Sequence, residues 1–319
     1  MDEQKETRGD MLVHATAADN YVRCMAAVTT NAVAEAAERH NTSYTVTAAL
    51  GRTLTGALLL GAGLKEFDRL TVQIESNGPV GSITAETNAR GQVRGYVRNP
   101  RADELLTDDG TYLLDERGKF SVSSVVGSGM LYVTRESGFD IGLYREPYRG
   151  SVPLVSGEIG EDFAYYLTKS EQIPSAVLLG VLVRAKETGE TYVEAAGGLI
   201  IQMMPGADEK LITRLEESIM KMPHTTSLIR EGAQPVDMLR MALGDVGFEM
   251  LDERAVSFAC PCSHERAVSL ISSIDGTELE SMLREDKGAV MTCHFCNSTY
   301  NVDEATLANI LQERTATKE

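Results

Sequence analysis

The chain has 319 residues and a formal net charge of −17, with 47 Asp and Glu against 30 Lys and Arg. This acidic balance is unfavourable for binding nucleic-acid phosphates, which requires a basic surface. The most apolar stretch, residues 46–64, is broken by Arg52, threonines and four glycines, so it falls short of the roughly 18 uninterrupted apolar residues of a membrane helix. We therefore expect neither nucleic acid nor membrane as a partner, and the length predicts about two domains.

The N-terminal residues 1–10 are charged and lack the apolar core of a secretory signal. We therefore expect the protein to be cytoplasmic. Thiols are kept reduced in that compartment, and paired cysteines there are more often metal-binding or redox-sensing than structural.

Residues 1–204 are expected to form an N-terminal core domain of the α+β class. Helical periodicity predicts helices over 31–40, 46–60 and 160–173, the second of them buried. Alternating apolar residues and turn signals predict strands over 11–17, 21–28, 70–75, 82–86, 93–98, 120–126, 130–134, 177–183 and 199–203. Short strands separated by turns such as Asn77-Gly78-Pro79 indicate antiparallel sheets with helices packed on them.

Residues 205–254 are expected to form a helical connector. A second helix over 235–243 follows a first one that is marked by four apolar residues at helical spacing, Leu211, Leu215, Ile219 and Met222. Seven of the 13 methionines lie between Met203 and Met250. Flexible methionine suits surfaces that accommodate many shapes, although ordinary helix packing is the favoured interpretation.

Residues 255–319 contain four of the five cysteines, with short helices predicted over 264–272, 277–285 and 304–313. The cysteines form Cys260-Pro-Cys262 and, after 30 residues, Cys293-His-Phe-Cys296. Two closely spaced thiolate pairs on separate turns suit one tetrahedral metal site, and Zn²⁺ is the commonest occupant of a four-sulfur site. The sequence therefore predicts a small C-terminal zinc-binding domain that holds one Zn²⁺ per chain through Cys260, Cys262, Cys293 and Cys296.

Other interpretations of these cysteines stay open at this point. They could form two disulfides or lie in a core as free thiols, and His264 or His294 could substitute as a metal ligand. The Cys-x-Cys step is tighter than the Cys-x-x-Cys of ordinary zinc ribbons, which points toward redox function. The fifth cysteine, Cys24, has apolar neighbours in a predicted strand and is expected to be a buried, inert thiol.

Nothing in the sequence indicates an enzyme, and we assign no catalytic residues. The five histidines form no HExxH pair, and the glycine-rich stretches lack the pattern of a nucleotide-binding loop. A thiol-disulfide oxidoreductase would use Cys293 and Cys296, but such a pair normally begins a helix after a strand in a βαβ unit. A zinc-ribbon nucleic-acid-binding protein is disfavoured because residues 256–319 hold ten acidic against five basic residues.

With these residues in view, the chain resembles the heat shock protein 33 family of bacterial redox-regulated chaperones. The family is marked by a C-terminal Cys-x-Cys, about thirty residues, and a Cys-x-x-Cys, and the four cysteines named above match this pattern position for position. Residues 70–79, 165–174 and 197–205 resemble the family's core, and residues 258–266 resemble the segment that enters its zinc site.

The resemblance implies an ATP-independent holdase that is inactive when reduced and zinc-bound. Oxidants would convert the thiolates to disulfides and expel zinc, after which the protein would bind unfolding client proteins and prevent their aggregation under oxidative stress, as a homodimer. We expect the disulfides Cys260–Cys262 and Cys293–Cys296, because near neighbours close the smallest loops.

Overall fold

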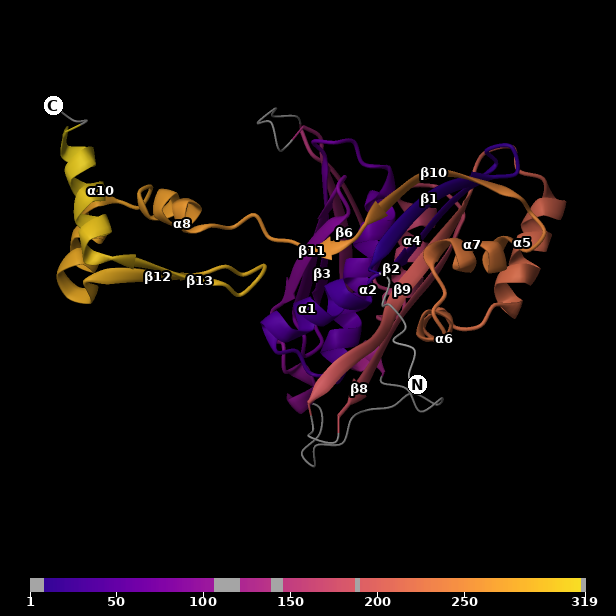
Figure 1. Cartoon of the computed structure of the whole chain (residues 1–319), viewed down its shortest axis with the longest axis horizontal. Helices are drawn as coiled ribbons and strands as arrows, with labels where there is room; N and C mark the ends of the chain where they lie inside the picture. Colours follow the sequence, from indigo (N-terminus) through magenta and orange to yellow (C-terminus); the bar gives the residue numbers. More distant parts are fainter. Residues whose placement is uncertain (1–8, 106–120, 139–145, 187–189, 317–319) are drawn as a thin grey trace, which may run out of the picture. The chain divides into compact units, whose positions relative to one another are not determined.

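The computed structural model describes residues 9–105, 121–138, 146–186 and 190–316 and divides into two compact units, Met1–Ala259 and Cys260–Glu319 (Figure 1). The connector expected over residues 205–254 belongs to the first unit. The division into three domains at 204 and 254 stays a prediction. Mixed helices and antiparallel sheets confirm the α+β class.

The first unit contains two sheets. One has five antiparallel strands in the order β10 (Phe248–Ala255), β1 (Met11–Ala17), β2 (Val22–Val28), β9 (Thr191–Met203) and β8 (Ser175–Ala185). The other has six strands in the order β11 (Ser257–Phe258), β5 (Gln92–Val97), β4 (Ser82–Asn88), β3 (Arg69–Ser76), β6 (Gly129–Glu136) and β7 (Tyr148–Pro153). Neighbouring strands of this sheet are antiparallel, except that β11 and β5 are parallel.

Helix α2 (Tyr44–Leu60) is the centre of the first unit and contacts strands of both sheets, β4 and β5 on one and β8 and β9 on the other (Figure 1). Its length and apolar composition would allow residues 44–63 to cross a membrane, but 89% of the most apolar 18-residue stretch of this segment is buried inside the unit. This is the property of a core helix. A Cβ at Gly56 would lie 2.5 Å from the ring of buried Phe163, on α4 (Gly160–Lys169), so this close approach requires glycine.

Helix α1 (Thr30–His40) is held at its N-terminus by the buried carboxylate of Asp10. The backbone N–H groups of Asn31 and Ala32 donate to that carboxylate at 3.1 and 2.8 Å. The first turn of a helix has N–H groups without partners inside the helix, and an acidic side chain satisfies them.

The connector helices α5 (Glu209–Lys221), α6 (Thr225–Arg230) and α7 (Pro235–Leu243) pack on the five-stranded sheet. Apolar residues from β1, β2 and β9 form one buried cluster with Leu215, Leu228, Met238 and Leu239. The predicted positions Leu211, Ile219 and Met222 are partly buried against the same cluster. These helices therefore cover an apolar sheet face, which agrees with ordinary helix packing, while Met220 is 85% exposed.

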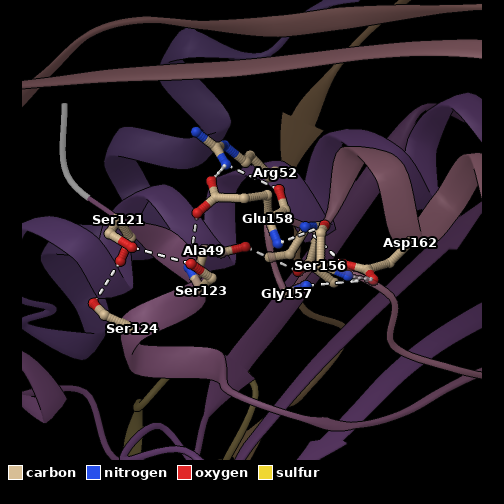
Figure 2. A network of polar contacts seen from close by, with 11 residues as sticks. Ala49, Arg52, Ser121, Ser123, Ser124, Ser156, Gly157, Glu158 and Asp162 are labelled. Atoms are coloured by element: carbon tan, nitrogen blue, oxygen red, sulfur yellow. Dashed lines mark hydrogen bonds and ion pairs between the residues drawn. The ribbon is translucent and has the colours of Figure 1, made fainter. Parts of the chain in front are cut away.

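A polar network joins α2 to the loop before α4 (Figure 2). Arg52 forms an ion pair of 2.7 Å with Glu158, whose carboxylate also accepts the backbone N–H of Ser123 at 2.9 Å. Next to it, the fully buried carboxylate of Asp162 accepts the N–H of Val155 and Ile159 at 2.7 and 2.9 Å. Ile159 has a φ of 71°, which is costly for a β-branched residue, so the network holds a strained turn.

Two predicted elements are wrong. The strand expected over 120–126 is a short helix, α3 (Val122–Val126), with Phe120 outside the described residues. Its three buried valines lie at i, i+3 and i+4, a helical spacing hidden in a β-branched sequence. The end of the helical connector is strand β10, which pairs with β1 at the edge of the five-stranded sheet. Strand β7 and helix α6 were not predicted.

The second unit is small. It contains α8 (His264–Ile271), α9 (Gly276–Ser281), a π-helical turn (Met282–Asp286), the hairpin β12 (Gly288–Thr292) and β13 (Thr299–Asp303), and α10 (Glu304–Ala316). The three helices predicted here are confirmed, the middle one shortened by the π turn. Its apolar core consists of five buried residues, Ile271, Leu279, Val302, Leu307 and Ile310.

Candidate metal centre

The two cysteine pairs lie on different local structures of the second unit. Cys260 and Cys262 precede α8, whose N-cap Ser263 accepts the N–H of Arg266 at 3.2 Å. Cys293 and Cys296 lie in the turn between β12 and β13. The N–H of Asn297, a residue at φ 57°, donates to the Cys293 carbonyl at 2.7 Å, which closes this turn.

All four predicted ligands come together. Their sulfur atoms lie within 4.8 Å of one another, with distances of 3.7 Å from Cys260 to Cys293 and 3.2 Å from Cys262 to Cys296. A tetrahedral zinc site with Zn–S bonds of about 2.3 Å has sulfur–sulfur distances of about 3.8 Å. The donor set is therefore suited to one tetrahedral, sulfur-ligated metal ion.

The histidines that flank the cysteines are not part of this group. His264 Nε2 lies 3.1 Å from the carbonyl oxygen of Asn301, and His294 is exposed. Within the described ranges, the four cysteines are the one group of His, Cys, Asp and Glu side chains close enough to share a metal. None of the thiols forms a disulfide here.

Two hydroxyl groups contact the sulfur atoms, and neither was predicted to have a role at the site. The Tyr300 hydroxyl donates to Cys262 Sγ at 3.0 Å, and Cys296 Sγ lies 3.3 Å from Ser298 Oγ. Both residues follow the second cysteine pair within four positions, Ser298 directly before β13 and Tyr300 as its second residue. Their proximity to that pair in the chain was the only available signal, because the contact of Tyr300 with Cys262 spans 38 residues.

Without a metal, the thiols differ in their readiness to lose a proton. Burial raises the pKa of Cys262 to about 12 and also raises the pKa of Cys293. Burial acts in the same direction on Cys296, but its hydrogen bonds with Ser298, Cys262 and Cys293 together outweigh burial and lower the pKa to about 7. Cys262 and Cys293 are therefore protonated at neutral pH, so binding a metal through four thiolates has to release protons.

Cys24 lies apart from the metal centre, in strand β2. It is fully buried, and burial raises its pKa to about 12. The thiolate, which is the reactive form, is therefore disfavoured, and the expectation of an inert core thiol is confirmed.

Known proteins resemble the chain over nearly its whole length. A family model described as Hsp33 protein matches residues 10–303. A relative from Desulforamulus reducens named 33 kDa chaperonin is 45% identical over 303 residues, which cover 95% of this chain and 97% of the relative. The chain belongs to the Hsp33 family. A second 33 kDa chaperonin, from Geobacillus kaustophilus, is 45% identical over 95% of this chain and 98% of the relative.

The fold is also that of the Hsp33 family. The crystal structure of the 33 kDa chaperonin from Thermotoga maritima matches with a TM-score of 0.82 and 34% identity, and it covers 97% of this chain and 100% of that one. The family match includes both units and all four cysteines. The chain therefore belongs to a family of chaperones, as its resemblance to that family implied.

Proposed function

We propose that this protein is a redox-regulated, ATP-independent holdase that is inactive while its four cysteines hold zinc and active after they are oxidised. The observation that carries the proposal is the convergence of four cysteine sulfurs in a unit whose main apolar cluster, in the part of the chain that the structure describes, has five buried members. A unit of about sixty residues obtains only marginal stability from its apolar core, so a metal or a cross-link can decide whether it is folded.

The metal centre would act as a folding switch. When bound, zinc supplies a closed tetrahedral cross-link and no open position for catalysis. Binding of structural zinc contributes about 10–16 kcal/mol to the folding of small metal-binding domains. Oxidation removes the thiolates on which this cross-link depends, since disulfide sulfur is a poor metal ligand, so the second unit would unfold.

The apolar sheet face under the connector is the surface that we propose binds clients. Helices α5, α6 and α7 cover it in the folded protein. Their displacement would expose a continuous apolar face from β1, β2 and β9, which is typical of a site for unfolded proteins. The proposed partners are unfolding client proteins and, after oxidation, a second copy of the chain. We propose that the protein acts in the cytoplasm and has no enzyme activity.

We propose that oxidation joins Cys260 to Cys262 and Cys293 to Cys296. In the folded unit all four sulfur atoms lie within 4.8 Å of one another, so proximity there does not favour one pairing. Once the unit unfolds, the small loops within each pair close most readily. Peptide mapping of the oxidised protein that found mainly linkages such as Cys262 to Cys293 would refute this pairing.

A thiol-disulfide oxidoreductase is a weaker alternative. Cys293 and Cys296 lie in a turn between two antiparallel strands, whereas a catalytic pair normally begins a helix in a βαβ unit.

One experiment tests the proposal directly. Zinc is quantified in reduced protein, which is then treated with hypochlorite or warm hydrogen peroxide while zinc release and the aggregation of an unfolding client are followed together. We expect about one zinc per chain and suppression of aggregation that coincides with zinc release. Full holdase activity in the reduced, zinc-loaded protein would contradict the proposal.

A substitution in the connector tests the second step. Ile219→Asp places a charge where α5 packs on the sheet cluster, which should loosen the connector and confer some holdase activity in reductant. Met220→Asp is the matched control, because the side chain of Met220, the next residue in the chain, is 85% exposed and should tolerate the charge. If Ile219→Asp is inactive although hydrogen exchange shows its connector unfolded, the sheet face does not bind clients.

A further inference from the structure

Tyr300 is the only tyrosine in residues 260–319, and its hydroxyl contacts a cysteine of the opposite pair. It donates to Cys262 Sγ at 3.0 Å from strand β13. The contact therefore links the segment before α8 to the hairpin that carries Cys293 and Cys296.

The hairpin limits where the Tyr300 ring can lie. Tyr300 is directly opposite Met291 on β12, and Met291 packs against the core of the unit. Val302, two residues further along β13 and on the same face, is 1% exposed in that core. The ring is half-buried, so its hydroxyl is held near the sulfur by the folded hairpin.

We propose that Tyr300 is a positioning residue of the metal centre, which holds the Cys262 sulfur in place and protects it from oxidants. This inference rests on the proposed metal–thiolate centre. A hydrogen bond to an anionic sulfur stabilises its charge and lowers the electron density available to an electrophile. Partners of metal ligands commonly tune affinity and reactivity in this way.

The protected step is the attack of a sulfur lone pair on an oxidant such as hydrogen peroxide. The Cys262 thiolate takes one oxygen and releases hydroxide, which forms a sulfenic acid; a second cysteine thiolate then attacks that sulfur, forms the disulfide and releases a second hydroxide. Two thiolates thus supply the two electrons that reduce the peroxide. The Tyr300 hydroxyl slows the first attack, because it engages the lone pair that the attack requires.

The test compares full-length wild type with Tyr300→Phe, which removes only the hydroxyl. Tyr192→Phe, at an exposed tyrosine of the first unit, is the matched control. In Tyr300→Phe we expect zinc affinity to fall about tenfold, at the low end for lost partners of metal ligands. Zinc release by peroxide, followed with a chromophoric chelator, should be about fivefold faster, the effect of one lost hydrogen bond.

The cobalt-substituted protein supplies a readout that a purely structural role would not change. Loss of the hydrogen bond should move the sulfur-to-cobalt charge-transfer bands of Tyr300→Phe to lower energy, while Tyr192→Phe keeps the wild-type spectrum. Unchanged bands and an unchanged release rate would overturn the inference and leave the proposed switch intact.

If peroxide releases no zinc from the wild type but the cobalt bands still shift in Tyr300→Phe, the proposed function fails and the positioning role stands. If Tyr300→Phe fails to fold, protein made with 3-fluorotyrosine, a stronger donor of nearly the same size, should shift the bands to higher energy, and no shift would refute the role.

Discussion

The two units of this protein are stabilised in different ways. The first has a central buried helix between two sheets, with side chains as large as Phe163 and Tyr166 fully buried. The second has a core of five residues and a group of four cysteine sulfurs. A large apolar core is insensitive to redox conditions, whereas a fold that depends on thiolate ligands is not. The difference suggests why a redox switch would reside in the smaller unit.

The largest expected effect is loss of the metal centre. Replacing both Cys293 and Cys296 by Ser should unfold most of residues 260–316 and leave the first unit folded, because about 10–16 kcal/mol of metal binding energy is reduced or lost. Hydrogen exchange resolved by segment measures this. Cys24→Ala, in the first unit, is the control and should leave exchange in the second unit unchanged. Protection of the second unit in the double variant would contradict the comparison.

A cavity in the core of the first unit should have the next largest effect. Leu54 on α2 is fully buried, so Leu54→Ala should lower the free energy of unfolding of that unit by about 2–5 kcal/mol. Denaturant unfolding monitored in the first unit measures it. Leu270→Ala, at a side chain 60% exposed in the second unit, should change stability by less than about 0.5 kcal/mol. A loss at Leu54 as small as the one at Leu270 would argue against a tightly packed core.

The pH dependence of the first unit should include a contribution from Asp10. Burial raises its pKa from 3.8 to about 6, although hydrogen bonds from Ala32 and Asn31 oppose this. The folded state holds this proton more tightly than the unfolded state. The contribution of Asp10 to the stability of the folded unit is therefore fully present below pH 3.8 and is lost as the pH rises through about 6.

The size of this contribution is up to about 3 kcal/mol, since each pKa unit corresponds to about 1.4 kcal/mol. Asp10→Asn should flatten the pH dependence of unfolding of the first unit between about pH 4 and 7. Denaturant titrations at several pH values, compared with wild type, measure the slope. Identical slopes in the two proteins would mean that the raised pKa of Asp10 is wrong.

The smallest effect is expected at the surface of α1. Arg39 and Glu35 form an ion pair of 2.7 Å with side chains 37% and 43% exposed. Water and salt screen such a pair, so Glu35→Gln should cost about 0.3–0.5 kcal/mol at low ionic strength and less in high salt. Chemical denaturation at two salt concentrations measures this. A loss above about 1 kcal/mol would place this pair outside the usual range for surface pairs.

Elements with strong local patterns were predictable from the sequence. Helix α2 was expected over 46–60 because its apolar residues recur at helical spacing. The observed helix spans Tyr44–Leu60, and most of its residues are buried. The cysteine group was expected for a related reason: two closely spaced thiol pairs on separate turns suit one tetrahedral site. Helix α3 was missed because three valines favour a strand locally, and burial of one helical face overrides that preference.

By itself, the sequence determined the α+β class, the four candidate ligands and the family resemblance, since each depends on residue type and spacing along the chain. Only the tertiary structure decided that β10 pairs with β1, that the connector covers the sheet face, and that Tyr300 reaches Cys262. These are contacts between residues far apart in the chain. Local periodicity records which face of an element is apolar, but the choice of its partner depends on how all elements pack together.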